Sequence, residues 1–138
     1  MKVIVCLDDN CGMAFNNRRQ SKDRVVFEQI ASLCGGSVVF MSPYSAREFD
    51  GIYDAVVSDD NFLCIACEDD WVFAETESPD LNNTEKLVVF WWNRVYPADV
   101  YLGFDIENEC FELVSEADIV GYSHPKITKC VYEKRRGV

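Results

Sequence analysis

Short apolar runs alternate with polar segments along the chain, and their spacing predicts both strands and helices. The run from Val3 to Leu7 is rich in β-branched residues, as in a strand buried on both faces. Ser21 can cap a helix that runs to about Leu33, because apolar residues repeat there at helical spacing and Gly35-Gly36 follow. Val38 to Met41 is a second buried strand. This order is that of a βαβ unit, so we expect the two strands to be parallel.

Extended runs dominate the rest of the chain. Ser42-Pro43 opens a short helix to about Phe49, and a second short helix is predicted from Asp59 to Cys67. The predicted strands that follow are Trp71–Glu75, Leu87–Trp92, Val100–Asp105, Cys110–Val120 and Ile127–Lys134. The last two are joined by Gly121–Pro125 as an antiparallel hairpin. Without a repeat or linker, residues 1–138 are predicted to form a single α/β domain with a mixed, mostly parallel central sheet and few short helices.

The net charge of the chain disfavours some classes of binding partner. A net charge of −11 over 138 residues disfavours binding to nucleic acid or to anionic membranes. The longest later apolar run, Leu87 to Trp92, is well short of the roughly 20 residues that a membrane helix needs, and the apolar start is too short for a secretory signal. We therefore expect a cytoplasmic protein.

Two basic groups interrupt this acidic composition. From Glu48 to Glu85 there are twelve carboxylates and no lysine or arginine. Arg18, Arg19, Lys22 and Arg24, by contrast, lie within seven residues, and a second basic group ends the chain. Four cations so close together can hold a phosphorylated or carboxylated small ligand, or they can pair with the protein's own carboxylates.

The cysteines indicate a reducing environment and no metal site. Seven cysteines, an odd number, occur in a chain able to build its own core, so most are expected as small buried side chains. Cys64 and Cys67 have the spacing of a redox or metal pair, but they end a helical segment instead of opening one. His124 is the only histidine, and no second pair of zinc ligands has suitable spacing.

The order of elements resembles the dihydrofolate reductase family over nearly the whole chain, although each segment is a loose match. Val3 to Met13 is similar to that family's first strand and glycine-containing loop. Ser21 to Phe27 resembles the start of its first helix, where an acidic residue precedes a phenylalanine by four positions. Val38 to Ser45 takes the place of a strand followed by Gly-Arg and Thr, and Leu87 to Tyr96 that of a strand, glycine cluster and tyrosine. The resemblance implies that family's mixed sheet.

The departures from the family fall on the residues expected to bind its dinucleotide cofactor. The family's Gly-Arg-x-Thr, which holds cofactor phosphate, is replaced by Ser42-Pro43-Tyr44-Ser45, which lacks the arginine. Its glycine pair is replaced by Trp91-Trp92-Asn93, and two indoles remove the surface on which backbone approaches a dinucleotide. We therefore predict a retained fold without an NADPH site.

Several residues remain as candidates for a site. Asp23 matches the family's substrate-binding carboxylate, a role that needs a raised pKa, but it can equally be an acid favoured by the dipole of the helix. By the resemblance, the loop with Arg18 and Arg19 borders the central cleft. The other candidate ligand-binding residues are Phe27, Ser42, Tyr44, Ser45, Trp92 and Asn93.

Three hypotheses about function follow, and each assigns the protein to a different functional class. The first is a small-ligand-binding protein on a dihydrofolate reductase-like fold, not dependent on NADPH, that takes a small anionic ligand near Arg18 and Arg19. The second is an NADPH-dependent reductase of that family, with Asp23 as a catalytic residue. The third is a protein-interaction module or homodimer that uses the aromatic strand 90–92. The sequence does not identify the ligand.

Overall fold

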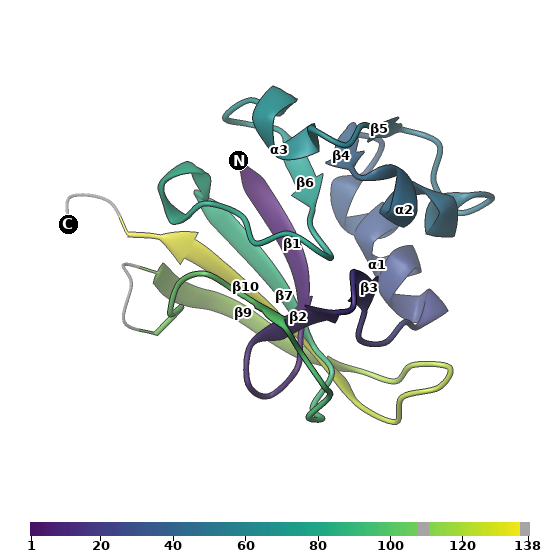
Figure 1. The fold of residues 1–138 in the computed structure, drawn as a ribbon, viewed down its shortest axis with the longest axis vertical. Coiled ribbons are helices and arrows are strands. Elements are labelled where there is room, and N and C mark those ends of the chain that lie inside the picture. The colour runs from purple at the N-terminus through teal and green to yellow at the C-terminus, as the bar shows by residue number, and fades with distance from the viewer. Residues whose placement is uncertain (108–110, 136–138) are drawn as a thin grey trace.

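A seven-stranded sheet forms the centre of the molecule (Figure 1). The computed structural model describes residues 1–107 and 111–135. The sheet has the order β5-β4-β6-β1-β7-β10-β9. Its strands are β1 (Lys2–Leu7), β4 (Val39–Met41), β5 (Val56–Ser58), β6 (Trp71–Phe73), β7 (Lys86–Trp91), β9 (Phe111–Ile119) and β10 (Ile127–Lys134).

Pairing in the sheet is parallel on one side and antiparallel on the other. β1 pairs in parallel with β6 and with β7, and β4 pairs in parallel with β5 and β6. β10 is antiparallel to both β7 and β9. The mostly parallel sheet and the C-terminal antiparallel hairpin are therefore confirmed. β1 and β4 are parallel as predicted, but β6 lies between them.

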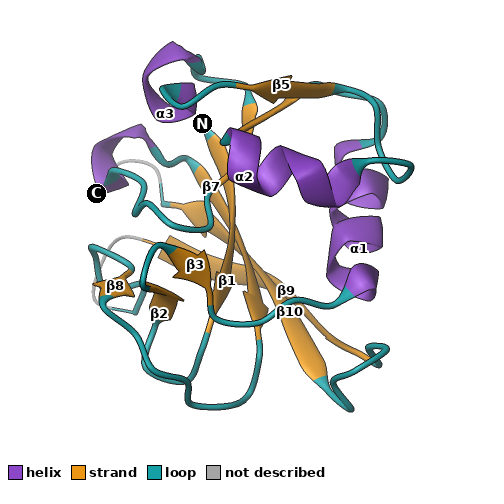
Figure 2. Ribbon diagram, turned by 45° about the vertical axis from the view of Figure 1, so that its right-hand side comes forward, coloured by secondary structure: helices purple, strands orange, loops and turns teal. Residues whose placement is uncertain are grey.

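The helices α1 (Arg24–Cys34), α2 (Pro43–Ala46) and the 3-10 helix η1 (Arg47–Phe49) cover one face of the sheet, whereas α3 (Phe62–Ile65), the 3-10 helix η2 (Leu81–Asn83) and a small second sheet pack against the other (Figure 2). The small sheet has the order β3-β2-β8, with β2 (Gly12–Phe15), β3 (Arg18–Arg19) and β8 (Val100–Tyr101). Within residues 1–107 and 111–135, no helix has the length and apolar character needed to span a membrane.

Alternation along β7 divides the core into two clusters. Val88, Phe90 and the following Trp92 pack with α1 on one face, whereas Leu87, Val89 and Trp91 face the cluster that includes β2. Neighbouring side chains of a strand point to opposite faces, so the two indoles lie on opposite sides of the sheet. Trp92 is buried and Trp91 is half-buried.

The aromatic strand does not provide the interaction surface predicted for residues 90–92. β7 is paired on both sides, with β1 and β10, so it has no free edge. Phe90 and Trp92 are both almost fully buried. Their apolar area stabilises this domain, and it is not available to a second chain.

Three local predictions need correction. The helix begins after Asp23, which is its cap, instead of after Ser21, because the Asp23 carboxylate accepts a hydrogen bond from Val25 N. The helix predicted over 59–67 shortens to α3, and the strand predicted over 100–105 shortens to β8. Asn16 and Asn17 form a hairpin turn between β2 and β3, with φ of 51° and 61°. Positive φ at both turn residues is the geometry that two-residue hairpins prefer, and it fixes where Arg18 begins β3.

Candidate functional site

Arg19 is held by carboxylates of the chain itself. Its Nε and Nη2 donate to the two oxygens of Glu75 at 2.8 and 2.9 Å, and Nη1 lies 3.2 Å from Glu48 Oε1. The guanidinium also lies over the ring of Tyr44, 4.1 Å from its centroid. Burial alone would lower the pKa of Arg19, but the hydrogen bond and charge of Glu75 raise it above its ordinary value. Arg19 therefore stays charged and already has its anionic partner.

Ser42, Tyr44 and Ser45 belong to the same network. Ser45 Oγ donates to Glu75 Oε1 at 2.7 Å, and Ser42 Oγ accepts from Ser45 N at the start of α2. The Tyr44 hydroxyl accepts from Arg19 N at 3.0 Å. These three candidate residues thus come together around Glu75, which the sequence analysis did not single out. Their polar groups hold β3 against α2.

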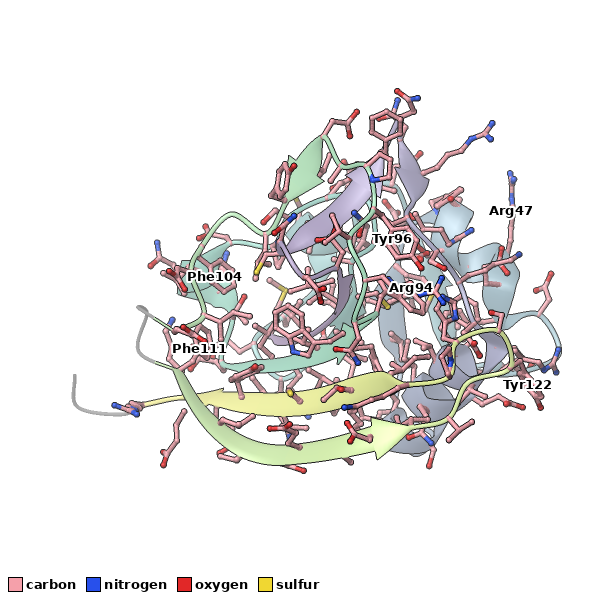
Figure 3. All side chains as sticks on the ribbon, turned by 90° about the horizontal axis from the view of Figure 1, so that it is seen from below. Arg47, Arg94, Tyr96, Phe104, Phe111 and Tyr122 are labelled. Carbon is pink, nitrogen blue, oxygen red and sulfur yellow. The ribbon has the colours of Figure 1, made fainter. Side chains whose placement is uncertain are left out.

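Arg18 has the opposite environment. Its side chain is exposed and forms no ion pair with any carboxylate in residues 1–107 and 111–135. It lines a cavity of about 440 Å³, called here the Arg18 cavity, whose walls include Phe15, Arg18, Arg19, Gln20, Tyr96 and Pro97. Figure 3 marks Tyr96, on the segment that follows β7.

Asp8 joins the segments that form this cavity. Its buried carboxylate, just after β1, accepts hydrogen bonds from Asn10 N and Gly12 N in the first loop. It also accepts from Gln20 Nε2 at 3.0 Å and from Tyr96 N at 3.1 Å. Two wall residues of the Arg18 cavity are therefore fixed to one carboxylate. The side-chain oxygen of Gln20 is buried without a hydrogen-bond partner in the described part of the chain, so it can accept a further donor.

Asp23 connects the start of α1 to the loop between β9 and β10. Its carboxylate accepts from Val25 N, Tyr122 N, Ser123 N and Ser123 Oγ, and His124 Nδ1 lies 3.0 Å from Oδ2. The loop contacts Asp23 through its backbone, whereas the exposed ring of Tyr122 points away into solvent (Figure 3).

The environment of Asp23 favours its ionised form. Burial would raise the pKa of Asp23, but the hydrogen bonds from His124, Ser123, Tyr122 and Val25 together lower it well below its ordinary value. A general acid needs a raised pKa, so this environment favours the role of a charged helix cap over that of a proton donor.

Phe27 lines a second cavity, separate from the Arg18 cavity. It has a volume of about 280 Å³ and is lined by Lys22, Asp23, Arg24, Phe27, Glu48, Ile52 and Ser123. It is called here the Phe27 cavity. Glu48 carries the negative charge nearest to Lys22, whose Nζ lies 3.3 Å from Oε2. The structure thus divides the candidate residues between two small cavities.

Trp92 and Asn93 each have partners within the chain. Trp92 is buried, and its ring lies against that of His124, with centroids 4.7 Å apart and the ring planes tilted by 32°. Asn93 has a φ of 60° and donates from Nδ2 to Thr128 Oγ1 at 3.0 Å and to Lys126 O at 3.3 Å. The two residues that the resemblance aligns with cofactor glycines therefore carry side chains that are packed or hydrogen-bonded within the chain.

The cysteines and other metal ligands form no metal centre in the described part of the chain. No group of three or more His, Cys, Asp and Glu side chains within it is placed to hold a metal ion. Cys34 and Cys130 are buried, and burial raises the pKa of Cys34 to about 11. Cys64 and Cys67 are exposed, so the expected burial does not extend to them. Cys110 lies outside the described residues.

The sequence did not indicate that His124 belongs to the Asp23 network. His124 is buried, and its Nε2 lies 2.8 Å from Ser21 Oγ and 3.4 Å from the hydroxyl of Tyr96. A lone histidine beside a proline in a turn is typical of a surface residue. Nothing in the local pattern indicates that it contacts Ser21 and Asp23, which lie about a hundred positions earlier in the chain.

Comparison with known proteins supports the fold. No family model matches the sequence, and no curated protein matches it. Among solved structures, dihydrofolate reductase from Enterococcus faecalis complexed with NADP(H) and RAB-propyl is similar, with a TM-score of 0.65. The match covers 97% of this chain and 95% of that chain at 9% sequence identity. The chain therefore has a dihydrofolate reductase-like fold.

Proposed function

We propose that this protein binds a small anionic ligand in the Arg18 cavity, on a dihydrofolate reductase-like fold and without NADPH. The supporting observation is the contrast between two adjacent arginines. Arg19 is neutralised by Glu75 and Glu48, whereas Arg18 lines the same cavity without an ion pair to any carboxylate of the described residues. An unpaired guanidinium in a cavity is suited to a carboxylate or phosphate group, which it can bind with two hydrogen bonds.

The walls of the cavity indicate the rest of the ligand. Phe15 and Tyr96 offer aromatic surface. The volume of about 440 Å³ lies within the range of ordinary small-molecule sites. A ligand with one anionic group and a flat or apolar body satisfies both features.

The NADPH-dependent alternative has weaker support. The neighbouring solved structure binds NADP(H), but 9% identity carries the fold alone. By the resemblance, the buried Trp92 stands where the family has a cofactor glycine, and Asp23 is held in its ionised form. A reductase would need both a dinucleotide surface and a proton donor, and neither residue favours it.

A thermal-shift series tests this proposal. The panel consists of NADPH, folates, phosphorylated metabolites and aromatic phosphates such as phenyl phosphate. A compound that binds the folded state at one site should stabilise it by about 2.7 kcal/mol at a concentration of about 100 times its Kd. We expect stabilisation by one or more small anions and none by NADPH. The proposal would be overturned if NADPH stabilises the protein, or if none of the compounds does.

A further inference from the structure

Ser21, His124 and Asp23 form a continuous hydrogen-bonded chain of hydroxyl, imidazole and carboxylate. Ser21 Oγ lies 2.8 Å from His124 Nε2, and His124 Nδ1 lies 3.0 Å from Asp23 Oδ2. The two contacts use opposite nitrogens of one ring. This is the arrangement in which a histidine takes a proton from a serine while a carboxylate orients the ring.

The surroundings of Asp23 assign the proton on the imidazole. The carboxylate already accepts hydrogen bonds from Val25 N, Tyr122 N and Ser123 N, all of which favour its ionised form. An ionised carboxylate can only accept, so Nδ1 carries the proton that it donates to Asp23. Nε2 is then the bare nitrogen, and the Ser21 hydroxyl donates to it.

Packing fixes the ring in this orientation. His124 has a side-chain exposure of 6%, and the buried Trp92 packs against its ring. Asp23 is buried as well, and its side-chain exposure is 0%. Ser21, by contrast, is half-buried. The base and its orienting carboxylate are thus shielded from water, whereas the residue that carries the hydroxyl is partly exposed.

Ser21 also lies beside space for a substrate. Its neighbour Gln20 lines the Arg18 cavity, and its neighbour Lys22 lines the Phe27 cavity. The hydroxyl of Tyr96, a wall residue of the Arg18 cavity, lies 3.4 Å from the same Nε2 that accepts from Ser21. Ser21 thus lies in sequence between a wall residue of each cavity, and its hydroxyl shares His124 Nε2 with a wall residue of the Arg18 cavity.

We propose that Ser21 is an activated nucleophile and that the chain hydrolyses small carboxylic esters. Ser21 Oγ attacks the ester carbonyl carbon, and its proton passes to His124 Nε2. The carbon–oxygen bond to the leaving alcohol then breaks, and the alcohol takes that proton from His124. Water attacks the carbonyl carbon of the resulting acyl-serine and gives a proton to His124 Nε2. The bond between that carbon and Ser21 Oγ then breaks, Oγ takes the proton back from His124, and the carboxylic acid leaves. Ser21 and His124 are the catalytic residues, and Asp23 is a positioning residue.

A covalent probe tests the nucleophile directly. The folded protein is incubated with a fluorophosphonate, which phosphonylates activated serines, and the adduct is located by peptide mass spectrometry. We expect one adduct, on Ser21, that is absent in Ser21→Ala and unchanged in the control Ser58→Ala, which removes an exposed hydroxyl from β5. The absence of an adduct on Ser21 in the native protein would overturn the proposal.

Ester hydrolysis gives a second readout that distinguishes chemistry from structure. With p-nitrophenyl acetate, we expect Ser21→Ala to lower the rate at least 100-fold and Ser58→Ala to leave it unchanged. Circular dichroism checks that both variants fold, and the half-buried position of Ser21 makes its replacement tolerable. Equal rates in the native protein and Ser21→Ala would show that Ser21 does not act. Ester hydrolysis does not depend on anion binding at Arg18, so failure of either proposal leaves the other standing.

Discussion

The imidazole of His124 and the carboxylate of Asp23 lie 3.0 Å apart although 101 positions separate them in the sequence. The contact fastens the loop between β9 and β10 to the first turn of α1. The same carboxylate is the cap of α1 and the acceptor for three further groups of the loop. One buried side chain thus couples the C-terminal hairpin to the helix that covers the sheet.

Stability should fall in acid because of Asp23. Its pKa is lowered in the folded state, so the unfolded chain takes up a proton first as the pH falls. The stabilisation is fully present above the ordinary aspartate pKa of about 4 and is lost as the pH drops below it. Urea unfolding between pH 7 and pH 3 measures this loss.

Asp23→Asn provides the matching variant. An amide cannot accept from all of its partners, so we expect it to lower the free energy of unfolding at pH 7 by about 2–3 kcal/mol and to flatten the acid dependence. Asp50→Asn, at an exposed aspartate, is the control. If Asp23→Asn keeps the native stability and the native pH dependence, the carboxylate is not the coupling element.

The two adjacent arginines should differ in their effect on stability. The Glu75 carboxylate has a side-chain exposure of 4%, and removing Arg19 leaves it without its cationic partner. Arg19→Ala should therefore lower the free energy of unfolding by about 3–5 kcal/mol. Arg18→Ala removes an exposed side chain and should change stability by less than about 0.5 kcal/mol. Urea unfolding of the two variants compares these values. Equal losses would contradict the assignment of Arg19 to structure and of Arg18 to binding.

Trp92 should be a core residue. It is 3% exposed and packs against His124, so Trp92→Ala should lower the free energy of unfolding by about 3–5 kcal/mol through lost burial and a residual cavity. Replacing the half-buried Trp91 by alanine should lower it by less. Thermal unfolding of both variants checks the order. A smaller loss for Trp92→Ala than for Trp91→Ala would show that Trp92 is not a core residue.

Gly121 should not tolerate a side chain. A Cβ at this position would collide with Oδ2 of Asp23 and lie 3.0 Å from the carbonyl oxygen of His124. Gly121→Ala therefore has to move the loop away from Asp23, at a cost of about 1–3 kcal/mol. We expect the mutation to lower the melting temperature and to shift the NMR signals of His124. An unchanged His124 spectrum would mean that the loop does not sit against Asp23 in solution.

The sequence predicted the strands well because their signal is local. The buried strand Val3–Leu7, the hairpin and the glycine-stopped helix each follow from apolar spacing and turn residues. The cap of α1 was assigned to the wrong residue because either Ser21 or Asp23 can accept from a helix N-terminus. Tertiary contacts decide between them, since Ser21 Oγ bonds to His124.

The candidate site was only partly predictable because its partners are distant in the chain. Glu75 lies 56 positions after Arg19, and no local pattern distinguishes it from the other carboxylates of an acidic segment. For the same reason the sequence could not tell that Arg19 is neutralised and Arg18 is not. Members of the basic group line the Arg18 cavity and the Phe27 cavity, but the sequence could not assign their roles.

The central claim is that Arg18 holds an anionic ligand, and a binding titration tests it most directly. The tightest-binding anion of the thermal-shift panel is titrated by calorimetry into the native protein, Arg18→Ala and Arg47→Ala. Arg47 is an exposed arginine that extends from η1 into solvent, so its variant controls for the loss of one positive charge (Figure 3). We predict that Kd rises at least about tenfold for Arg18→Ala, which corresponds to the loss of about 1.4 kcal/mol, and stays unchanged for Arg47→Ala. Equal affinity in all three proteins would contradict the claim.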